Sequence, residues 1–361
     1  MVSNSFDQQS SIAPRAQQVV TIHDVAREAG VTIGTVSKAL NGQGKLRPET
    51  RERVRAAAAR LGFRPNEHAQ NLMRGRSFTV GLITTDSYGR FSIPLMLGIE
   101  DTLGPAQISV FLCDARDDPA REQQHIESLL AKRVDGIIVT GRRIDPRPPI
   151  DIGNAGIPVL YAYTQTTDSG ALCLLPDDEQ GGRIAIEHLL RLGRRHIAHI
   201  TGPLRFESVR LREKGMRTVL AEYGLPYVEQ RVFSGPWQER WGYEAVSLLL
   251  ERKTPFDAIF CGSDQLARGV ADALRERGVR VPDDVALVGF DNWEIIAAAT
   301  RPPLTTVDMN MHTLGQLAGE RLLAMMNGER EMGVRRIPCS LVIRDSCGAR
   351  LQGEGAGERV S

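Results

Sequence analysis

Three polar side chains directly follow two apolar segments of the chain and could bind a ligand. Asp291 follows residues 285–290, and Ser263 and Asp264 follow residues 258–261. If both segments are parallel strands, their carboxyl ends lie at one edge of a sheet, where ligands bind in open α/β folds. A carboxylate there can accept hydrogen bonds from two neighbouring hydroxyl groups of a ligand. An alternative for Asp264, at least equally well supported, is the N-cap of a helix.

The residue types that would support catalysis or metal binding lack the required spacing. The sequence contains no GxGxxG motif after a strand, no Walker-type Gly-Lys-Ser/Thr, no HExxH and no GxSxG. The seven histidines show no metal-ligand spacing, and the five cysteines are scattered without a CxxC pair. We therefore expect no catalytic residue, no metal site and no cofactor, and reduced cysteines in a cytoplasmic protein.

Positive charge is concentrated near the N-terminus, although the net charge of the chain is only +1. Residues 19–76 contain eleven basic and five acidic side chains, residues 1–18 contain one of each, and the remainder is mildly acidic. A basic segment on an acidic body is expected where that segment alone binds a polyanion such as nucleic acid. Considered alone, the charge is explained equally well by a solvated surface.

The basic segment has the pattern of three short helices. Thr21 can cap the first helix, and Thr32 can cap a second whose apolar face consists of Ile33, Val36, Ala39 and Leu40. A third helix begins near Pro48 and stops at Gly62. This pattern predicts a helix-turn-helix within a small all-α head over residues 19–64.

From residue 78 onward, short apolar runs alternate with amphipathic helices. We expect strands at residues 80–83, 108–113, 136–140, 159–161, 197–201, 258–261 and 285–290. These runs lack polar alternation, which is typical of buried parallel strands. So many strand–helix units predict an α/β body of two doubly wound parallel sheets, arranged as two lobes with a cleft between them.

Length and composition agree with several folded domains. A chain of 361 residues with 42% apolar and 25% charged residues is too long for one compact domain and too apolar for extensive disorder. No run approaches the roughly 20 apolar residues of a membrane helix, and the polar N-terminus lacks the pattern of an export signal. We expect residues 1–18 and 349–361 to be disordered tails.

Several motifs, in order, resemble those of the lactose/galactose repressor (LacI/GalR) family. The first is TIHDVAREAGVTIGTVSKALNG at residues 21–42, followed by RPETRERVRAAAARLGFRPN at residues 47–66. The matches continue with DDEQGGRIAIEHLLRLG, CGSDQLARG, VALVGFD and PPLTTV, so they extend over nearly the whole chain. The resemblance implies a homodimeric transcription regulator, associated with the nucleoid, whose core resembles periplasmic binding proteins. An apolar helix around Leu314, Leu317, Leu322 and Leu323 adds weak support for the dimer.

The resemblance also implies a division of the chain. The head at residues 19–64 is followed by a hinge helix at 65–76 and a core at 77–348. The first lobe of the core takes residues 77–175 and 308–335, and the second takes residues 176–307 and 336–348.

In such a regulator the second helix of the head enters the major groove of operator DNA. Ile33, Gly34 and Lys38 fall where the family reads bases, and among these three only Lys38 can donate to guanine. Ile33 could contact a thymine methyl group or could instead pack inside the head. We expect the remaining contacts of the head with DNA to come from Thr21, Thr32, Thr35, Ser37 and Asn41.

Residues 65–74, PNEHAQNLMR, resemble the hinge helix of the family. Ten residues are below the roughly 12 to 15 that a helix needs in water, so its order would come from DNA and from the partner's hinge. Leu72 matches the residue that is inserted into the minor groove and kinks the duplex, and Ala69 is small enough for close approach of two hinges. Asn66 and Met73 complete the expected contacts. A linker with an incidental leucine is the alternative, and it predicts that Leu72→Ala leaves operator affinity unchanged.

For the core, the resemblance implies an effector site in the cleft. Arg212 matches the arginine that holds the effector, Trp237 matches an aromatic residue that stacks on a sugar, and Phe91 and Tyr161 match cleft positions of the first lobe. Together with Asp291, these residue types favour a sugar-like ligand. The run YGRFSIP around Phe91 departs from the usual family pattern.

These inferences predict a repressor of sugar uptake or catabolism genes that binds a palindromic operator as a dimer and is released by a sugar-like ligand. Corepression is an alternative that the sequence does not decide. A solute-binding or sensory receptor would share the core without needing a basic head. A sugar-metabolising α/β enzyme is the remaining alternative.

Overall fold

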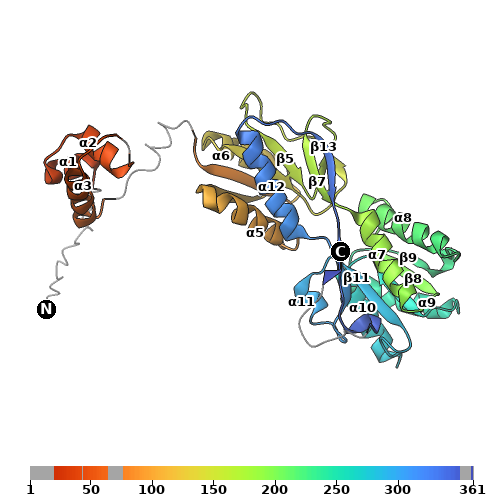
Figure 1. Cartoon of the computed structure of the whole chain (residues 1–361). Coiled ribbons are helices and arrows are strands. Elements are labelled where there is room, and N and C mark those ends of the chain that lie inside the picture. Colours follow the sequence, from red (N-terminus) through yellow and green to blue (C-terminus); the bar gives the residue numbers. More distant parts are fainter. Residues whose placement is uncertain (1–19, 43, 64–75, 350–358, 361) are drawn as a thin grey trace, which may run out of the picture. The chain divides into compact units, whose positions relative to one another are not determined.

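The computed structural model describes residues 20–42, 44–63, 76–349 and 359–360. The chain forms two compact units, residues 1–75 and 76–361, which we call the head and the core (Figure 1). The N-terminal tail and the hinge segment at 65–75 lie outside the described residues, so the predictions made for them remain predictions.

The head consists of three helices, as predicted: α1 (Ile22–Ala29), α2 (Ile33–Leu40) and α3 (Pro48–Leu61). Gly30 and Gly62 follow α1 and α3 in the left-handed conformation, which a residue without Cβ adopts at little cost. The hydroxyl of Thr32 accepts a hydrogen bond from the backbone N–H of Thr35 at 3.3 Å and so caps α2. The buried core of the head is small: Val25, Ala26, Ala29, Val36, Ala39, Val54, Ala57 and Ala58.

The sequence predicts Ile33 on the apolar face of α2, but in the structure this residue is not buried with the rest of that face. Its side chain is 40% exposed and does not join the buried cluster that contains Val36 and Ala39. The reason is its position as the first residue of the helix, where its side chain lies outside the three-helix contact. The alternative in which Ile33 packs inside the head is therefore wrong.

The first lobe of the core is built on a parallel sheet of six strands in the order β13-β7-β5-β3-β1-β2. The strands are β1 (Thr79–Thr84), β2 (Ser109–Asp114), β3 (Gly136–Thr140), β5 (Val159–Ala162), β7 (Leu172–Pro176) and β13 (Gly333–Ile337). Its helices are α5 (Ser92–Leu103), α6 (Pro119–Ala131) and α12 (Met311–Met326), with the short elements η1 (Gly104–Ala106), β4 (Pro146–Arg147) and β6 (Gln165–Thr166).

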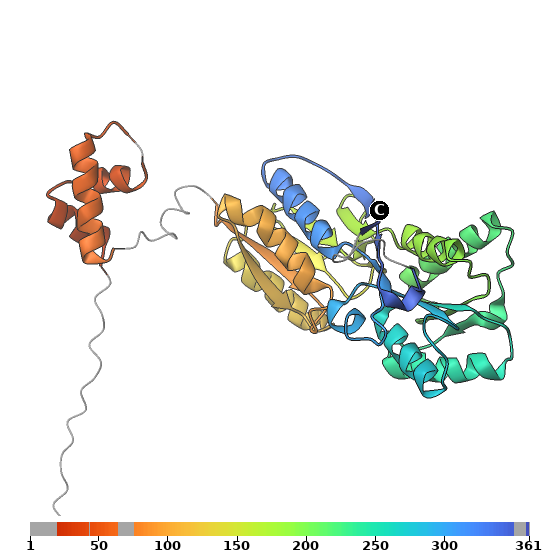
Figure 2. The ribbon, with the colours of Figure 1, turned by 60° about the horizontal axis from the view of Figure 1, so that its bottom comes forward.

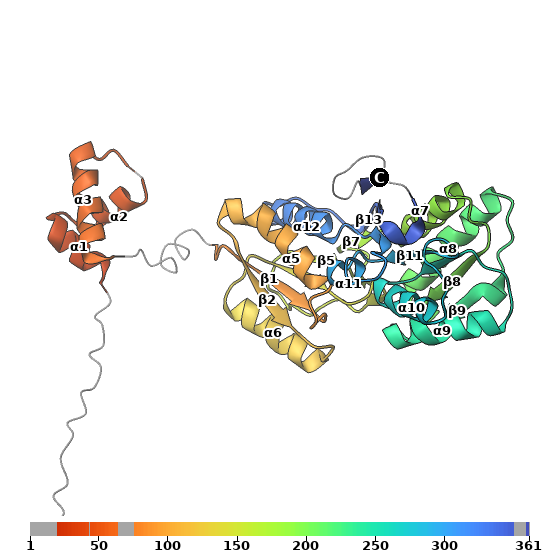
Figure 3. The same ribbon diagram turned by 90° about the horizontal axis from the view of Figure 1, so that it is seen from below.

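The second lobe is built on a sheet in the order β15-β14-β12-β11-β10-β8-β9, of which β8, β9 and β11 are labelled in Figure 3. The strands are β8 (Ile197–Thr201), β9 (Val232–Ser234), β10 (Ala258–Cys261), β11 (Ala286–Phe290), β12 (Thr305–Asp308), β14 (Ser340–Val342) and β15 (Arg359–Val360). The neighbouring strands among β9, β8, β10, β11 and β12 pair in parallel. Strand β14 is antiparallel to both of its neighbours, β12 and β15. The helices are α7 (Asp178–Arg191), α8 (Glu207–Glu222), α9 (Glu239–Glu251), α10 (Asp264–Glu276), α11 (Glu294–Ala297), η2 (Glu229–Arg231) and η3 (Asp345–Cys347).

The chain passes between the lobes after β7, after β12 and after β13. The predicted α/β core of two largely parallel sheets is thus confirmed, and the lobes are joined by several segments rather than one. The pairing of β15 with β14 differs from the prediction of a disordered C-terminal tail for residues 359–360. Among the described residues, no helix combines the length and the apolar character needed to cross a membrane.

Two predictions about burial in the first lobe are wrong. Strand β2 is at the edge of its sheet, and Phe111 and Leu112 are 43% and 42% exposed, although their apolar run predicted a buried strand. Conversely, Leu314 and Leu322 of α12 are fully buried in the core of their own lobe. They are therefore not available for contact with a second copy of the chain, whereas Leu317 and Leu323 of the same helix are half-buried.

Pairs of glycines allow the helices to pack closely. On α5 and α12, which lie side by side in Figure 1 and Figure 2, a Cβ atom on Gly98 would overlap the carbonyl oxygen of His312, and one on Gly315 would overlap that of Leu95. The same reciprocal arrangement recurs between α9 and α10, at Gly242 and Gly269. These contacts leave no room for any larger residue.

The third pair, Gly182 on α7 and Gly215 on α8, bears on the candidate site. A Cβ atom on Gly182 would overlap the backbone of Arg212, and one on Gly215 would overlap the carbonyl oxygen of Glu179. The close approach of α7 and α8 therefore sets the position from which the side chain of Arg212 extends.

Candidate functional site

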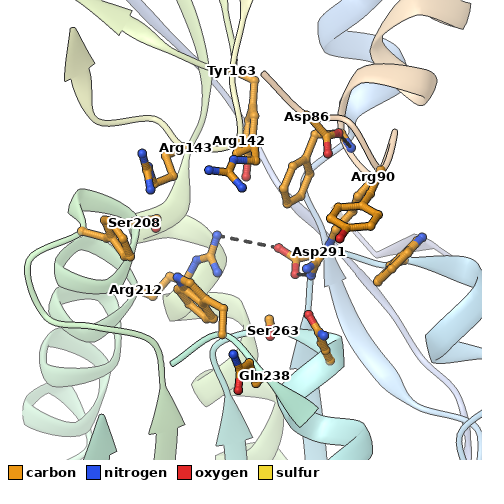
Figure 4. A pocket seen from close by; sticks show the side chains of 16 residues that line it. Asp86, Arg90, Arg142, Arg143, Tyr163, Ser208, Arg212, Gln238, Ser263 and Asp291 are labelled. Carbon is orange, nitrogen blue, oxygen red and sulfur yellow. Dashed lines mark hydrogen bonds and ion pairs between the residues drawn. The ribbon is translucent and has the colours of Figure 1, made fainter. Parts of the chain in front are cut away.

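A cavity of about 700 Å³ lies between the two lobes (Figure 4). Many of its lining residues follow the carboxyl ends of strands in both sheets, where binding sites of open α/β sheets are found. The first lobe contributes Asp86, Tyr88, Arg90, Phe91, Arg142, Arg143 and Tyr163. The second lobe contributes Phe206, Ser208, Arg212, Trp237, Gln238, Ser263, Gln265, Asp291 and Trp293.

Arg212 is held rigidly by buried partners. Its Nε donates to Asp178 Oδ1 at 2.7 Å and its Nη1 donates to the carbonyl oxygen of Gly262 at 2.6 Å. The guanidinium carbon lies 3.6 Å from the centre of the Phe290 ring, a cation–π geometry. Burial raises the pKa of Asp178, and the adjacent Arg212 opposes that shift. Its Nη2 also lies 2.7 Å from Asp178 Oδ1 and is 3.9 Å from Asp291 Oδ1, across the cavity wall.

Arg90 and Asp291 form an ion pair between the lobes. Arg90 precedes α5 in the first lobe, and Asp291 follows β11 in the second, with side chains 14% and 4% exposed. Arg90 also lies between the rings of Phe91 and Trp293, at 4.9 and 5.0 Å from their centres. Burial lowers the pKa of Arg90. Asp291 has a φ of 107°, a conformation that L residues rarely adopt, which directs its side chain toward both arginines.

Aromatic rings supply the apolar part of the cavity wall. Phe91 and Tyr163 are in contact, with ring centres 4.6 Å apart. Trp237 lies against Gly202, where a Cβ atom would overlap the indole ring. Flat apolar surfaces beside polar groups are suited to a ligand with C–H faces and hydroxyl groups.

Five of the seven predicted effector residues line this cavity: Phe91, Arg212, Trp237, Ser263 and Asp291. Tyr161 does not, because its side chain packs inside the first lobe, in the buried cluster that contains Ile126 and Leu129 of α6. It is 1% exposed within the first lobe, and its hydroxyl accepts a hydrogen bond from the backbone N–H of Ile150 at 2.9 Å. Tyr163, two residues later and beyond the end of β5, lines the cavity instead.

Asp264 also lies outside the cavity lining. It is completely buried, and it accepts hydrogen bonds from the hydroxyl of Thr306 and from the backbone N–H of Trp293. Burial raises its pKa to about 7. The N-cap of α10 is Ser263, whose hydroxyl accepts from the backbone N–H of Leu266, so the capping alternative for Asp264 is wrong.

Sequence reasoning missed several cavity residues that an available signal would have found. Arg142 and Arg143 come directly after the predicted strand at 136–140, and Tyr163 comes after the strand at 159–161. The rule that identified Asp291 applies equally to them. Arg90 and Trp293 carry no such signal, because their positions depend on how the two lobes meet.

In the head, the predicted DNA-contacting residues lie on α2 or at its two ends, except Thr21, which precedes α1. Ile33, Gly34 and Lys38 are exposed on this helix, whereas Thr35 and Ser37 are half-buried. The hydroxyls of Thr32 and Thr35 lie 3.0 Å apart, and the amide of Asn41 donates to Ser37 Oγ at 3.4 Å. Thr21 donates through its hydroxyl to Asp24 at 2.7 Å. The predicted hinge residues, Asn66, Ala69, Leu72 and Met73, lie outside the described residues.

Two family models match the chain. The model for bacterial regulatory proteins of the lacI family matches residues 21–66, and that for a periplasmic-binding-protein-like domain matches residues 186–347. The chain is 32% identical to catabolite control protein A of Priestia megaterium over 91% of its length and 99% of that protein. It is also 32% identical to the lactose operon repressor of Escherichia coli (strain K12), over 90% of each chain.

The solved structures that resemble this chain are also those of transcription regulators. The lac repressor dimer bound to operator and the anti-inducer ONPF is 29% identical, with a TM-score of 0.75 over 91% of this chain and 99% of that chain. The complex of the transcriptional regulator CelR with cellobiose has a TM-score of 0.63 over the same shares of the two chains, at 29% identity. These relatives are transcription regulators and not enzymes. This chain therefore belongs to the lacI family of bacterial regulatory proteins.

Proposed function

We propose that this regulator represses genes for the uptake or catabolism of a sugar, that it binds a palindromic operator as a dimer in the cytoplasm, and that a sugar-like ligand in the cavity releases it. The observation that carries the proposal is the lining of the cavity, which comes from both lobes. A ligand there contacts both lobes at once and favours one relative orientation of them. Release then requires that this orientation binds the ligand more tightly than the DNA-bound one does.

The exposed face of α2 supports the DNA-binding part of the proposal. Val36 and Ala39 are buried against the other helices, which leaves Ile33, Gly34 and Lys38 free to meet a major groove. Lys38 can donate to guanine O6 or N7, and Ile33 can contact a thymine methyl group. Two heads of a dimer would occupy two half-sites. The proposed insertion of Leu72 into the minor groove adds the kink between them.

The test begins with the selection of binding sequences from random DNA by the full-length protein, followed by affinity measurements at fixed salt. Lys38→Ala should relax base preference at one position of each half-site and cost about tenfold or more in affinity. Lys45→Ala is the matched control, since Lys45 is exposed in the same head but lies outside α2. It should weaken binding about equally for all sequences.

The second part of the test adds mono- and disaccharides to the complex with the selected operator. Trp237→Ala should reduce the ligand response without changing operator affinity, because Trp237 lies in the core cavity. Absence of sequence preference, or an operator complex that no sugar or sugar derivative dissociates, would contradict the proposed function.

A further inference from the structure

The charged groups of the cavity indicate a narrower class of ligand, an inference that rests on the proposed function. We propose that the effector is an acidic sugar, a polyhydroxylated compound with a carboxylate or phosphate group, and that this anionic group binds Arg142 and Arg143 beside Ser208. These three residues lie together on one side of the cavity (Figure 4).

The carboxylates that line the cavity are committed to protein partners. Asp86 Oδ2 accepts hydrogen bonds from the backbone N–H groups of Phe91 and Ser92, at 2.7 and 3.0 Å, at the start of α5. Asp291 is paired with Arg90 and lies near Arg212. A neutral sugar that required these carboxylates as acceptors would have to compete with buried cations and helix N–H groups.

Two arginines that line the cavity, unlike its carboxylates, have exposed side chains. Arg142 and Arg143 follow β3 in the first lobe, and both side chains are exposed. Arg142 pairs with Asp117 at the surface, where the two side chains are 43% and 40% exposed. An exposed pair of this kind contributes little stability, so Arg142 can exchange its partner cheaply.

Arg143 has no ion pair or side-chain hydrogen bond among the described residues. Its guanidinium carbon lies 5.0 Å from the centre of the Phe206 ring, which keeps the group beside the start of α8. A planar guanidinium in this position can donate two parallel hydrogen bonds to a carboxylate or phosphate. The excess of unpaired positive charge in the cavity is therefore located at Arg143.

The arrangement also connects the anion to both lobes. Arg142 and Arg143 belong to the first lobe, whereas Ser208 is the second residue of α8 in the second lobe. An anion bound between them would link the lobes at the side of the cavity away from the Arg90–Asp291 pair (Figure 4). The rest of the ligand would then lie toward Trp237 and Gln238, where an aromatic face and an amide are available for its C–H groups and hydroxyls.

The experiment compares matched neutral and acidic sugars by calorimetric titration of the full-length protein. Glucose and galactose serve as the neutral probes, their uronates and aldonates carry a carboxylate, and their 6-phosphates carry a phosphate. At least one acid should bind about tenfold or more tightly than its neutral partner, and the tighter of the two acidic arms identifies the anionic group. Equal or tighter binding of the neutral sugar, or no binding by any acid of the panel, overturns the proposal.

Variants locate the anion site. Arg143→Gln and Arg142→Gln should each weaken binding of the acid by about ten- to a hundredfold, the usual effect of losing a charged hydrogen bond. Arg195→Gln is the control, because Arg195 is exposed on the core but does not line the cavity. Unchanged affinity of the acid in both cavity variants also overturns the proposal.

The two proposals fail in distinguishable ways. A neutral sugar that dissociates the operator complex would overturn the acidic ligand class and leave the proposed function intact. If an acid bound through Arg143 but the protein showed no sequence-specific DNA binding, the proposed function would be overturned and the acidic ligand class would stand.

Discussion

Arg90 and Asp291, which are 201 residues apart in the chain, pair across the cavity and join the two lobes. Asp291 also faces Arg212, so one carboxylate lies between two buried guanidinium groups. The stability of the core and the geometry of the cavity therefore depend on the same carboxylate.

Replacement of this carboxylate should destabilise the core. In Asp291→Ala, Arg90 loses its buried counter-ion and faces Arg212 directly, a type of change that costs about 3–5 kcal/mol. Urea denaturation of the full-length protein measures the free energy of unfolding. The control is Asp283→Ala, which removes the more distant of the two carboxylate partners of Arg280, in a pair whose side chains are 68% and 66% exposed. That variant should change stability by less than about 0.5 kcal/mol, and an equal loss in both variants would refute the proposed role of Asp291.

His199 should make the stability of the core depend on pH. It is fully buried, stacks on Phe260, and its Nδ1 lies 3.0 Å from the carbonyl oxygen of that residue. Burial lowers its pKa to about 4. Below about pH 6.5 the unfolded chain binds a proton that the folded protein does not, so stability falls as the pH drops from about 6.5 toward 4.

The measurement is the free energy of unfolding at pH 7 and pH 5, for the natural protein and for His199→Asn. The histidine should account for up to about 2 kcal/mol of the loss between these values, and the asparagine variant should lack that part. His196→Asn, at an exposed position, is the control. If the natural protein and His199→Asn lost the same amount of stability, His199 would not be the group responsible.

Gly182 should be required for the position of Arg212. In Gly182→Ala the new methyl group would overlap the backbone of Arg212 and push α8 away from α7. We expect a loss of about 1–3 kcal/mol or more, together with weaker ligand binding. In Gly104→Ala the added methyl group meets nothing within 4 Å and φ is −56°, so this variant should be neutral or slightly more stable. Equal stability and ligand affinity in the two variants would contradict this account.

The proposed dimer should depend on an exposed apolar surface of the first lobe. Ile93 and Leu97 on α5 are 42% and 48% exposed, and Leu112, on the α5 face of the adjacent edge strand β2, is 42% exposed. Leu112→Asp should convert the dimer to a monomer at micromolar concentration, measured by size-exclusion chromatography with light scattering. Leu248→Asp, at a 39% exposed position on α9 of the other lobe, should leave the dimer intact. Dissociation by both or by neither variant would place the interface elsewhere.

Local patterns in the sequence determined most of the elements. The caps and apolar spacing around Thr32 and Gly62 predicted the head, and the apolar runs ending at Cys261 and Phe290 predicted β10 and β11 nearly to the residue. Asp291 could be identified from its place after such a run, and Arg142 and Arg143 by the same rule. These features depend on neighbours within a few residues, which a sequence displays directly.

Burial, partners and the direction of side chains were decided only by the tertiary structure. Tyr161 and Tyr163 share a residue type and are two residues apart, yet one is in the core of the first lobe and the other lines the cavity. Asp264 is completely buried by segments distant in sequence, and the apolar run of β2 is exposed because no strand lies beyond it. The pairing of Arg90 with Asp291 requires both lobes at once. Such contacts arise from how separate segments pack, and no local pattern of polarity encodes that packing.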